Sequence, residues 1–228
     1  MEKMMPACAQ CSVKDKMCVK QEGSGPDFCP TKTQDKIVQS ALKKYQDPEI
    51  LRFAHAASVQ EAECYVRREE KPFVLRPTKT RVEEVMEFAQ RMGYRKLGVA
   101  FCNGLAREAG TFARILEQNG FEVVSVNCKV GRVEKEFLGL KDAQKVKVGC
   151  PESMCNPISQ AEILNEAGTE FNVLLGLCVG HDSLFLKNAK AFTTVLVVKD
   201  RVLGHNSVAA LYGAHSYFQR LMVPDKKS

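Results

Sequence analysis

The sequence predicts an α/β protein with a mostly parallel open sheet of the Rossmann-like, three-layer type, preceded by a small cysteine-rich module and a helical connector. Two observations carry this prediction. Strand-like and helix-like hydrophobic segments alternate from residue 77 onward, and four of the ten cysteines lie before residue 30. A chain of 228 residues with 45% hydrophobic and 26% charged side chains can bury a core that needs no cross-links.

The first 34 residues are expected to form a metal-binding module. Cys8, Cys11, Cys18 and Cys29 follow a C-x2-C-x6-C-x10-C pattern in a segment with few apolar side chains. Such a segment becomes ordered when a thiolate-bound metal supplies folding free energy. The two-residue spacing is typical of zinc knuckles and ribbons, and an iron–sulfur cluster also takes four thiolates. We predict a metal here, with zinc favoured; the alternative is four reduced, unligated cysteines.

Residues 35–76 are expected to form a helical connector. Apolar side chains recur at helical spacing from Asp35, and Asp47-Pro48 begins a second helix with an N-cap and a proline at its first position. Cys64 lies in this second helix, where a small buried hydrophobic role is favoured over a chemical one.

Residues 77–228 are expected to form the α/β domain. Thr80 caps a helix that ends at Gly93, and further helices follow Gly104, Asn156-Pro157, His181 and Asn206. The expected strands are 96–101, 121–126, 171–177 and 191–198, with a less clear one at 145–148. This alternation predicts right-handed βαβ units with helices on both faces of the sheet.

Cysteines concentrate at one predicted edge of that sheet. Three lie directly after strands or within two positions of their ends, a fourth follows the doubtful strand, and a fifth precedes a helix; these are Cys102, Cys128, Cys178, Cys150 and Cys155. Ligands of open parallel sheets bind at the carboxyl ends of the strands. Thiolates converging there from separate loops favour a [4Fe–4S] cluster over a zinc ribbon, whose ligands come in short-spaced pairs.

Other interpretations of this edge stay open. A second zinc, or a persulfide or disulfide redox pair made by Cys150 and Cys155, is compatible with the pattern. His181 follows Cys178 in a C-x2-H spacing, so it is a candidate ligand, proton donor or helix cap, and His205 is a weaker candidate. Asn103, Asn127 and Asn156 adjoin these cysteines as candidate caps or hydrogen-bond donors. The sequence contains no phosphate-binding glycine loop.

Charge and hydropathy restrict the partners. The net charge of +6 is spread along the chain, and tryptophan is absent, so nucleic-acid binding is not expected. The first residues lack the apolar stretch of a signal peptide, and the longest apolar runs are shorter than the roughly 20 residues of a membrane helix. We therefore expect no membrane partner and a cytoplasmic location, where thiols stay reduced. The expected partners are a small molecule or a redox protein.

Three runs carry a family resemblance: residues 150–157 (CPESMCNP), 176–182 (GLCVGHD) and 198–206 (VKDRVLGHN). Together with the amino-terminal cysteines, they resemble an uncharacterised family of bacterial and archaeal cysteine-rich metal-binding proteins. The resemblance spans nearly the whole chain and implies metal ligands at Cys8, Cys11, Cys18 and Cys29 and at the strand-end cysteines. It implies no reaction.

The sequence thus predicts a metal-binding protein with redox, sulfur or electron-transfer chemistry at a cysteine-ligated site, with [4Fe–4S] favoured there. The alternative is a non-enzymatic zinc-binding protein that serves as an accessory, traffics metal or binds a partner. The sequence leaves the substrate and the oligomeric state open.

Overall fold

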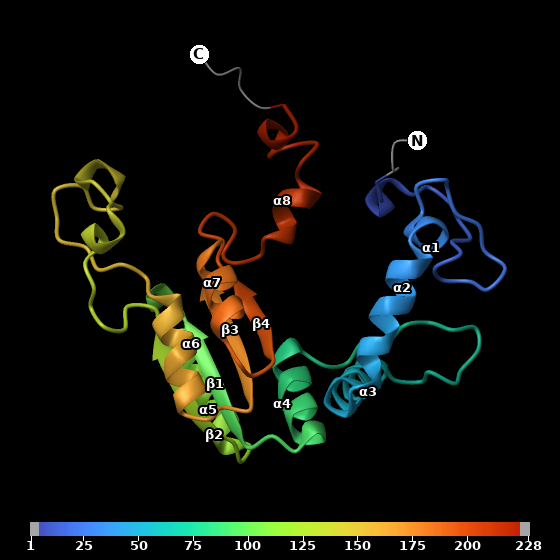
Figure 1. Ribbon diagram of the computed structural model, residues 1–228, viewed down its shortest axis with the longest axis horizontal. Coiled ribbons are helices and arrows are strands. Elements are labelled where there is room, and N and C mark those ends of the chain that lie inside the picture. Colours follow the sequence, from blue (N-terminus) through green and yellow to red (C-terminus); the bar gives the residue numbers. More distant parts are fainter. Residues whose placement is uncertain (1–4, 224–228) are drawn as a thin grey trace. The chain divides into compact units, whose positions relative to one another are not determined.

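A computed structural model describes residues 5–223 (Figure 1). The chain forms two compact units, residues 1–63 and 64–228. The boundary falls inside the predicted connector, so the helices before it belong with the cysteine segment and residues 64–76 belong with the α/β unit.

The first unit consists of a loop-rich cysteine segment followed by helices. A 3-10 turn (η1, Cys8–Gln10) opens it, and its helices are α1 (Pro30–Thr33), α2 (Asp35–Leu42), η2 (Lys43–Gln46) and α3 (Pro48–Glu63). The Asp47 carboxylate accepts hydrogen bonds from the backbone N–H groups of Glu49 and Ile50, at 2.9 and 3.1 Å. The predicted helix start at Asp47-Pro48 is therefore confirmed.

The second unit contains a four-stranded, all-parallel sheet, as the sequence predicts. Its strands are β1 (Lys96–Phe101), β2 (Glu122–Asn127), β3 (Phe171–Leu177) and β4 (Thr193–Val198), in the order β2-β1-β3-β4. Because all four run the same way, their carboxyl ends meet at one edge. The chain leaves β1 toward β2 and then returns to the other side of β1, so the order reverses between β1 and β3.

Helices connect the strands and cover the sheet (Figure 1). α5 (Ala106–Gln118), α6 (Pro157–Glu166) and α7 (His181–Asn188) are these helices, whereas α4 (Arg81–Met92) precedes β1 and α8 (Val208–Tyr212) follows β4 and buries no residue. The 3-10 turns are η3 (Asn103–Leu105), η4 (Lys135–Leu138), η5 (Asp142–Gln144) and η6 (Gln219–Leu221). The Thr80 hydroxyl and the Glu83 carboxylate form a capping box at the start of α4. Gly93, at φ +73°, ends that helix in the left-handed conformation.

The core lies on both faces of the sheet. β3 is buried along its whole length, as expected for a central parallel strand. On one face, α6 and α7 pack against each other and cover a buried cluster that includes Ala100, Val126, Leu174 and Phe185. α5 contacts β1 and β2, and right-handed crossovers place it on the opposite face.

The predicted strand at 145–148 is wrong. These residues lie in a loop between β2 and α6, where Val146 is 83% exposed. A strand needs a partner for its backbone groups. Here the N–H groups of Val146 and Lys147 instead donate to the Glu152 carboxylate, at 2.9 and 3.1 Å. The alternating Lys-Val pattern therefore reflects an exposed loop rather than a half-buried strand.

No helix within residues 5–223 combines the length and apolar character that crossing a bilayer requires.

Gly176 shapes the carboxyl end of β3. It adopts a φ of +70°, and one of the two register shifts between β3 and β4 spans it, between Leu175 and Leu177. A Cβ at this position would lie 2.3 Å from Cδ1 of the buried Leu105. Leu105 ends η3, which begins directly after Cys102. The missing side chain thus lets the loop after β1 pack closely against β3.

Gly176→Ala should destabilise the protein by about 2–4 kcal/mol, because it combines a left-handed backbone strain with overpacking. Urea unfolding followed by circular dichroism measures this. Gly110→Ala in α5 is the control, since a Cβ there meets nothing within 4 Å. That control should be neutral or stabilising by up to about 1 kcal/mol. Equal effects of the two substitutions would contradict the role assigned to Gly176.

Candidate thiol site

Four cysteines lie at or near the carboxyl edge of the sheet. Cys102, Cys128 and Cys178 each follow the last residue of β1, β2 and β3, and Cys155 precedes Asn156, the N-cap of α6. The sequence placed all four at this edge. The three strand ends are separated along the chain, and the parallel topology brings them to one edge of the sheet.

Three of these cysteines pack against one another. Cys128 is 2% exposed and belongs to the core cluster under α6 and α7, while Cys102 and Cys155 are half-buried and pack against that cluster. The Cys128 side chain interacts with the thiols of both Cys102 and Cys155. We name Cys102, Cys128 and Cys155 the thiol triad.

Gln160 joins the three segments that carry the triad cysteines. This α6 residue is fully buried, and its Nε2 donates to the carbonyl oxygens of Phe101 at 3.2 Å and Val126 at 2.7 Å. Those carbonyls lie at the ends of β1 and β2, beside Cys102 and Cys128. One side-chain amide therefore ties α6 and the Cys155 segment to both strand ends.

Backbone hydrogen bonds complete the arrangement. The N–H of Asn156 donates to the Cys128 carbonyl at 2.8 Å, and the N–H of Asn103 donates to the Cys128 sulfur at 3.3 Å. The Asn127 amide donates to the Asn103 side-chain oxygen at 2.9 Å, which joins the loops after β1 and β2. Asn156 caps α6 by accepting from the N–H of Ser159. The asparagines thus act as the cap and the donors that the sequence suggested.

The triad divides into two acidic thiols around a protonated one. Hydrogen bonding to Cys128 lowers the pKa of Cys102 to about 5, helped by the Gly104 N–H and the Lys199 ammonium. The Cys128 interaction, with that of His181, lowers the pKa of Cys155 to about 4, and Lys129 adds to this effect. Cys128 has a single S–H proton to share with its two neighbours; this hydrogen bonding and desolvation raise its own pKa.

His181 adjoins the triad through Cys155. It is the first residue of α7, and a hydrogen bond with Cys155 raises the pKa of the imidazole, with the negative charge of that thiolate acting in the same direction. The His181 side chain makes no cap hydrogen bond at the start of α7, so of the three roles left open by the sequence, ligand and proton donor remain. His205 instead stabilises the loop after β4. Its backbone has a φ of +69°, and its Nδ1 accepts a hydrogen bond from the N–H of Asp200 at 3.1 Å.

Cys178 lies at the same edge with a different partner. The Arg201 guanidinium donates to its sulfur at 3.1 Å. Lys199, two residues before Arg201, contacts Cys102. Sequence analysis missed both cations because it treated the positive charge as dispersed. The signal available was their position directly after β4, at the edge where the cysteines gather.

Cys150 is not brought to the triad. With no strand at 145–148, it is an exposed residue of the loop between β2 and α6. Ion pairs hold that loop: Lys135 to Glu152 at 2.7 Å, and the largely buried Lys145 ammonium to Glu136 and Asp142. Cys155 has Cys128 and His181 as its partners, so the predicted Cys150–Cys155 pair is not formed.

The amino-terminal cysteines differ in exposure. Cys8 and Cys18 are exposed, Cys11 is half-buried and Cys29 is buried. Desolvation raises the pKa of Cys29, but hydrogen bonds from Thr31 and Lys32 outweigh it, and the net shift is downward. A Cβ on Gly25 would lie 3.1 Å from the Cys29 sulfur, so this glycine lets the chain pass close to that thiol.

Metal-binding geometry is not preformed in the described part of the chain. Within residues 5–223, no group of three or more histidine, cysteine, aspartate or glutamate side chains is arranged to hold a metal ion. In the triad, thiols contact one another through Cys128. The structure therefore shows where thiols gather and not how they coordinate.

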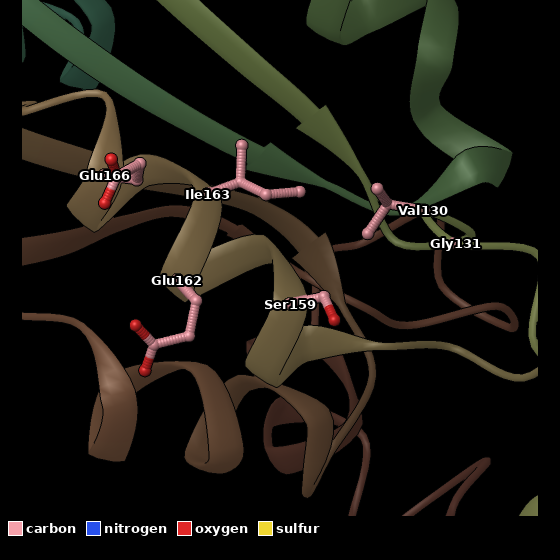
Figure 2. Close-up of a pocket in the computed structure, with 6 residues that line it drawn as sticks. All are labelled: Val130, Gly131, Ser159, Glu162, Ile163 and Glu166. Carbon is pink, nitrogen blue, oxygen red and sulfur yellow. The ribbon is translucent and has the colours of Figure 1, made fainter.

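A shallow hollow of about 450 Å³ lies beside α6 (Figure 2). Its lining contains no cysteine: it consists of Val130, Gly131, Ser159, Glu162, Ile163 and Glu166. The hollow is thus separate from the thiols, and its two glutamates come from α6.

Comparison with known proteins identifies the family. Residues 29–196 match the family described as "Protein of unknown function (DUF1847)". The chain belongs to the DUF1847 family. An uncharacterized protein of Methanocaldococcus jannaschii, MJ0455, is 41% identical over 215 residues, which cover 94% of this chain and 97% of the relative. The DUF1847 match includes the whole triad and begins at Cys29, so Cys8, Cys11 and Cys18 precede it.

Two crystal structures of Dph2 from Pyrococcus horikoshii are distantly similar, at 17% identity. One match covers 43% of this chain and 22% of Dph2 with a TM-score of 0.27. The other, to Dph2 with a 4Fe-4S cluster, covers 63% and 34% with a TM-score of 0.33. This chain thus spans about a third or less of the Dph2 length, and the likeness carries no argument about function.

In metal-free protein, iodoacetamide should alkylate Cys102 and Cys155 even in mild acid, because their pKa values of about 5 and 4 keep them as thiolates. We expect each rate to be near its plateau by about pH 6 and to fall as the pH drops through these values, measured by peptide mass spectrometry. His181→Gln should raise the Cys155 pKa and shift only that profile. A midpoint near that of a free thiol, about 8.5, at both sites would contradict the assignment.

Proposed function

We propose that the thiol triad ligates an iron–sulfur cluster, with [4Fe–4S] favoured, and that the protein carries out redox, sulfur or electron-transfer chemistry there. The observation that supports this most strongly is the gathering of three cysteines from separate loops at the carboxyl edge of a parallel sheet. Thiolates are the ligands that such clusters take.

The hydrogen-bond donors and cations around the triad suit thiolate ligands of such a group. Asn103 and Gly104 direct consecutive backbone N–H groups at the sulfurs of Cys128 and Cys102. N–H···S hydrogen bonds are one means by which proteins tune the reduction potential of a cluster. Lys129, Lys199 and His181 supply positive charge around thiols that must be deprotonated to act as ligands.

Each part of the chain has a defined task in this proposal. A bound cluster would supply one-electron transfer or a Lewis-acidic iron. The loops after β1 and β2 would present Cys102 and Cys128, and α6 would present Cys155. Packing of Cys128 into the core limits water access, which also affects the potential. A small molecule or a redox protein would be the partner, in a cytoplasmic setting.

Cysteine substitution tests the proposal. After anaerobic purification or iron–sulfide reconstitution, we expect about four iron and four sulfide per chain and absorption near about 400 nm. Cys102→Ser, Cys128→Ser and Cys155→Ser should each remove most of this iron, because each removes a ligand.

Cys150→Ser is the matched control, since Cys150 is exposed and lies outside the triad. Its iron content should equal that of the wild type. A wild-type protein that stays colourless after reconstitution would overturn the proposal, as would equal iron loss in the control. Circular dichroism of each variant shows whether iron loss follows from unfolding.

We propose further that Cys8, Cys11, Cys18 and Cys29 bind zinc. The segment they occupy contains little buried apolar surface: of its residues 5–29, only Cys29 is classed as buried. Structure without a core requires another source of stability, and a structural zinc site supplies one.

Zinc analysis of the iron-loaded protein should give about one zinc per chain. Cys11→Ser should abolish this zinc and speed trypsin cleavage after Lys14, Lys16 and Lys20, because the backbone loses its cross-link and becomes mobile. The same variant should keep its iron, which separates the two sites. Zinc retained in Cys11→Ser, or trypsin resistance unchanged by a chelator, would contradict the assignment.

Thiol redox chemistry is the second candidate function. It is favoured by one observation, the direct contact of Cys128 with two thiols of lowered pKa. Oxidation would form an S–S bond between Cys128 and the thiolate of Cys102 or Cys155, with two electrons passing to an external oxidant and the Cys128 proton released. Suppose that the protein takes up no iron in the reconstitution and forms one of these disulfides reversibly. That result would favour thiol redox chemistry over a bound cluster.

A further inference from the structure

The loop after β4 holds two cations against the sheet edge. Lys199 and Arg201 follow β4 directly, and the N–H of Lys199 donates to the Leu177 carbonyl at the end of β3, at 3.2 Å. Lys199 contacts Cys102 after β1, and Arg201 contacts Cys178 after β3. The two cations therefore approach the two strands between which the strand order reverses.

The loop is built in a way that fixes these positions. The Asp200 carboxylate accepts from the N–H groups of Val202 and Leu203, at 3.0 and 2.8 Å. The backbone N–H of His205 donates to the Asp200 carbonyl at 2.9 Å, and the His205 ring accepts from the Asp200 N–H. His205 adopts a left-handed backbone at φ +69°, a conformation that costs free energy in a non-glycine residue. The acid between the cations is thus engaged by the loop itself.

Neither cation is neutralised by a carboxylate. Other basic residues of this unit form ion pairs with acids, among them Lys96, Lys135 and Lys145. In the described part of the chain, no carboxylate lies within ion-pair distance of Lys199 or Arg201. Arg201 is also solvent-exposed, so the guanidinium has donors available beyond the one that it directs at Cys178.

Lys199 and Arg201 lie where parallel sheets commonly bind ligands. Open parallel sheets bind ligands at the carboxyl edge where the strand order reverses, which here is the gap between β1 and β3. Arginine and lysine at such a position recognise the oxygens of carboxylates and phosphates. Lys199 lies beside the triad, where its charge stabilises a thiolate. Arg201 contacts Cys178, which lies outside the triad, so stabilising the triad thiolates does not explain its position.

We propose that Lys199 and Arg201 form an anion subsite, which holds the carboxylate or phosphate group of a small-molecule substrate beside the thiol triad at the β1–β3 switch point. The substrate class is therefore a small oxyanion-bearing metabolite. This inference rests on the proposed function only in taking the triad as the reactive centre; the subsite itself depends on the two cations and the fold.

Alkylation of Cys178 by a charged and a neutral reagent tests the subsite. Metal-free, full-length protein is treated with iodoacetate or iodoacetamide, and the rate at Cys178 is followed by peptide mass spectrometry. Both reagents attack the same sulfur, so the ratio of their rates cancels any change in the reactivity and exposure of Cys178 that a substitution causes. We expect Arg201→Gln and Lys199→Gln each to lower the iodoacetate-to-iodoacetamide ratio by about fivefold, the effect of one nearby charge in a water-like medium. Millimolar inorganic phosphate should slow only iodoacetate.

Lys187→Gln on α7 is the control for net charge, since it removes one exposed lysine outside this loop. Its ratio should match that of the wild type. Ratios unchanged in both loop variants, or a wild-type ratio insensitive to phosphate, would overturn the subsite. Because the alkylation test uses metal-free protein, a negative result would contradict the anion subsite and not the cluster. A protein that binds no iron would contradict the cluster and not the anion subsite.

Discussion

The site depends on one side-chain amide. Gln160 donates from α6 to the carbonyls at the ends of β1 and β2, and in doing so fixes the helix that follows Cys155 against the strands that precede Cys102 and Cys128. The interaction is fully buried, so losing it would leave strand-end carbonyls without this donor in a dry environment, at a cost of about 1–3 kcal/mol. The triad is thus positioned from within the core and not by its exposed loops.

This origin explains the character of the site. Cys128 belongs to the core cluster and is buried, so its thiol is desolvated. Cys102 and Cys155 lie on the side that water reaches, where backbone N–H groups and cations favour their thiolates. A buried ligand beside two accessible ones suits either a bound cluster or a central redox thiol. The cations after β4 then define where a charged substrate would approach.

Most of the fold could be predicted from the sequence, because each element is encoded locally. Thr80 and Glu83 form the capping box that starts α4, Asn156-Pro157 starts α6, and the apolar run of β3 marks a central parallel strand. Strand polarity then placed the cysteines at one edge. The strand predicted at 145–148 was wrong because its alternating Lys and Val residues match the local strand pattern. The hydrogen bonds from Val146 and Lys147 to the Glu152 carboxylate are visible only in the folded structure. Gln160 acts through hydrogen bonds to residues 59 and 34 positions away, which local patterns do not encode.

The central claim is that Cys102, Cys128 and Cys155 share one bound cluster. An iron-edge anomalous difference map from anaerobically grown crystals tests it most directly, because it locates iron without reference to activity. We expect a single compact iron peak at the carboxyl edge of the sheet, within bonding distance of all three sulfurs. Iron bound only by the amino-terminal cysteines, or a triad closed by a disulfide with no iron in crystals of reconstituted protein, would contradict it.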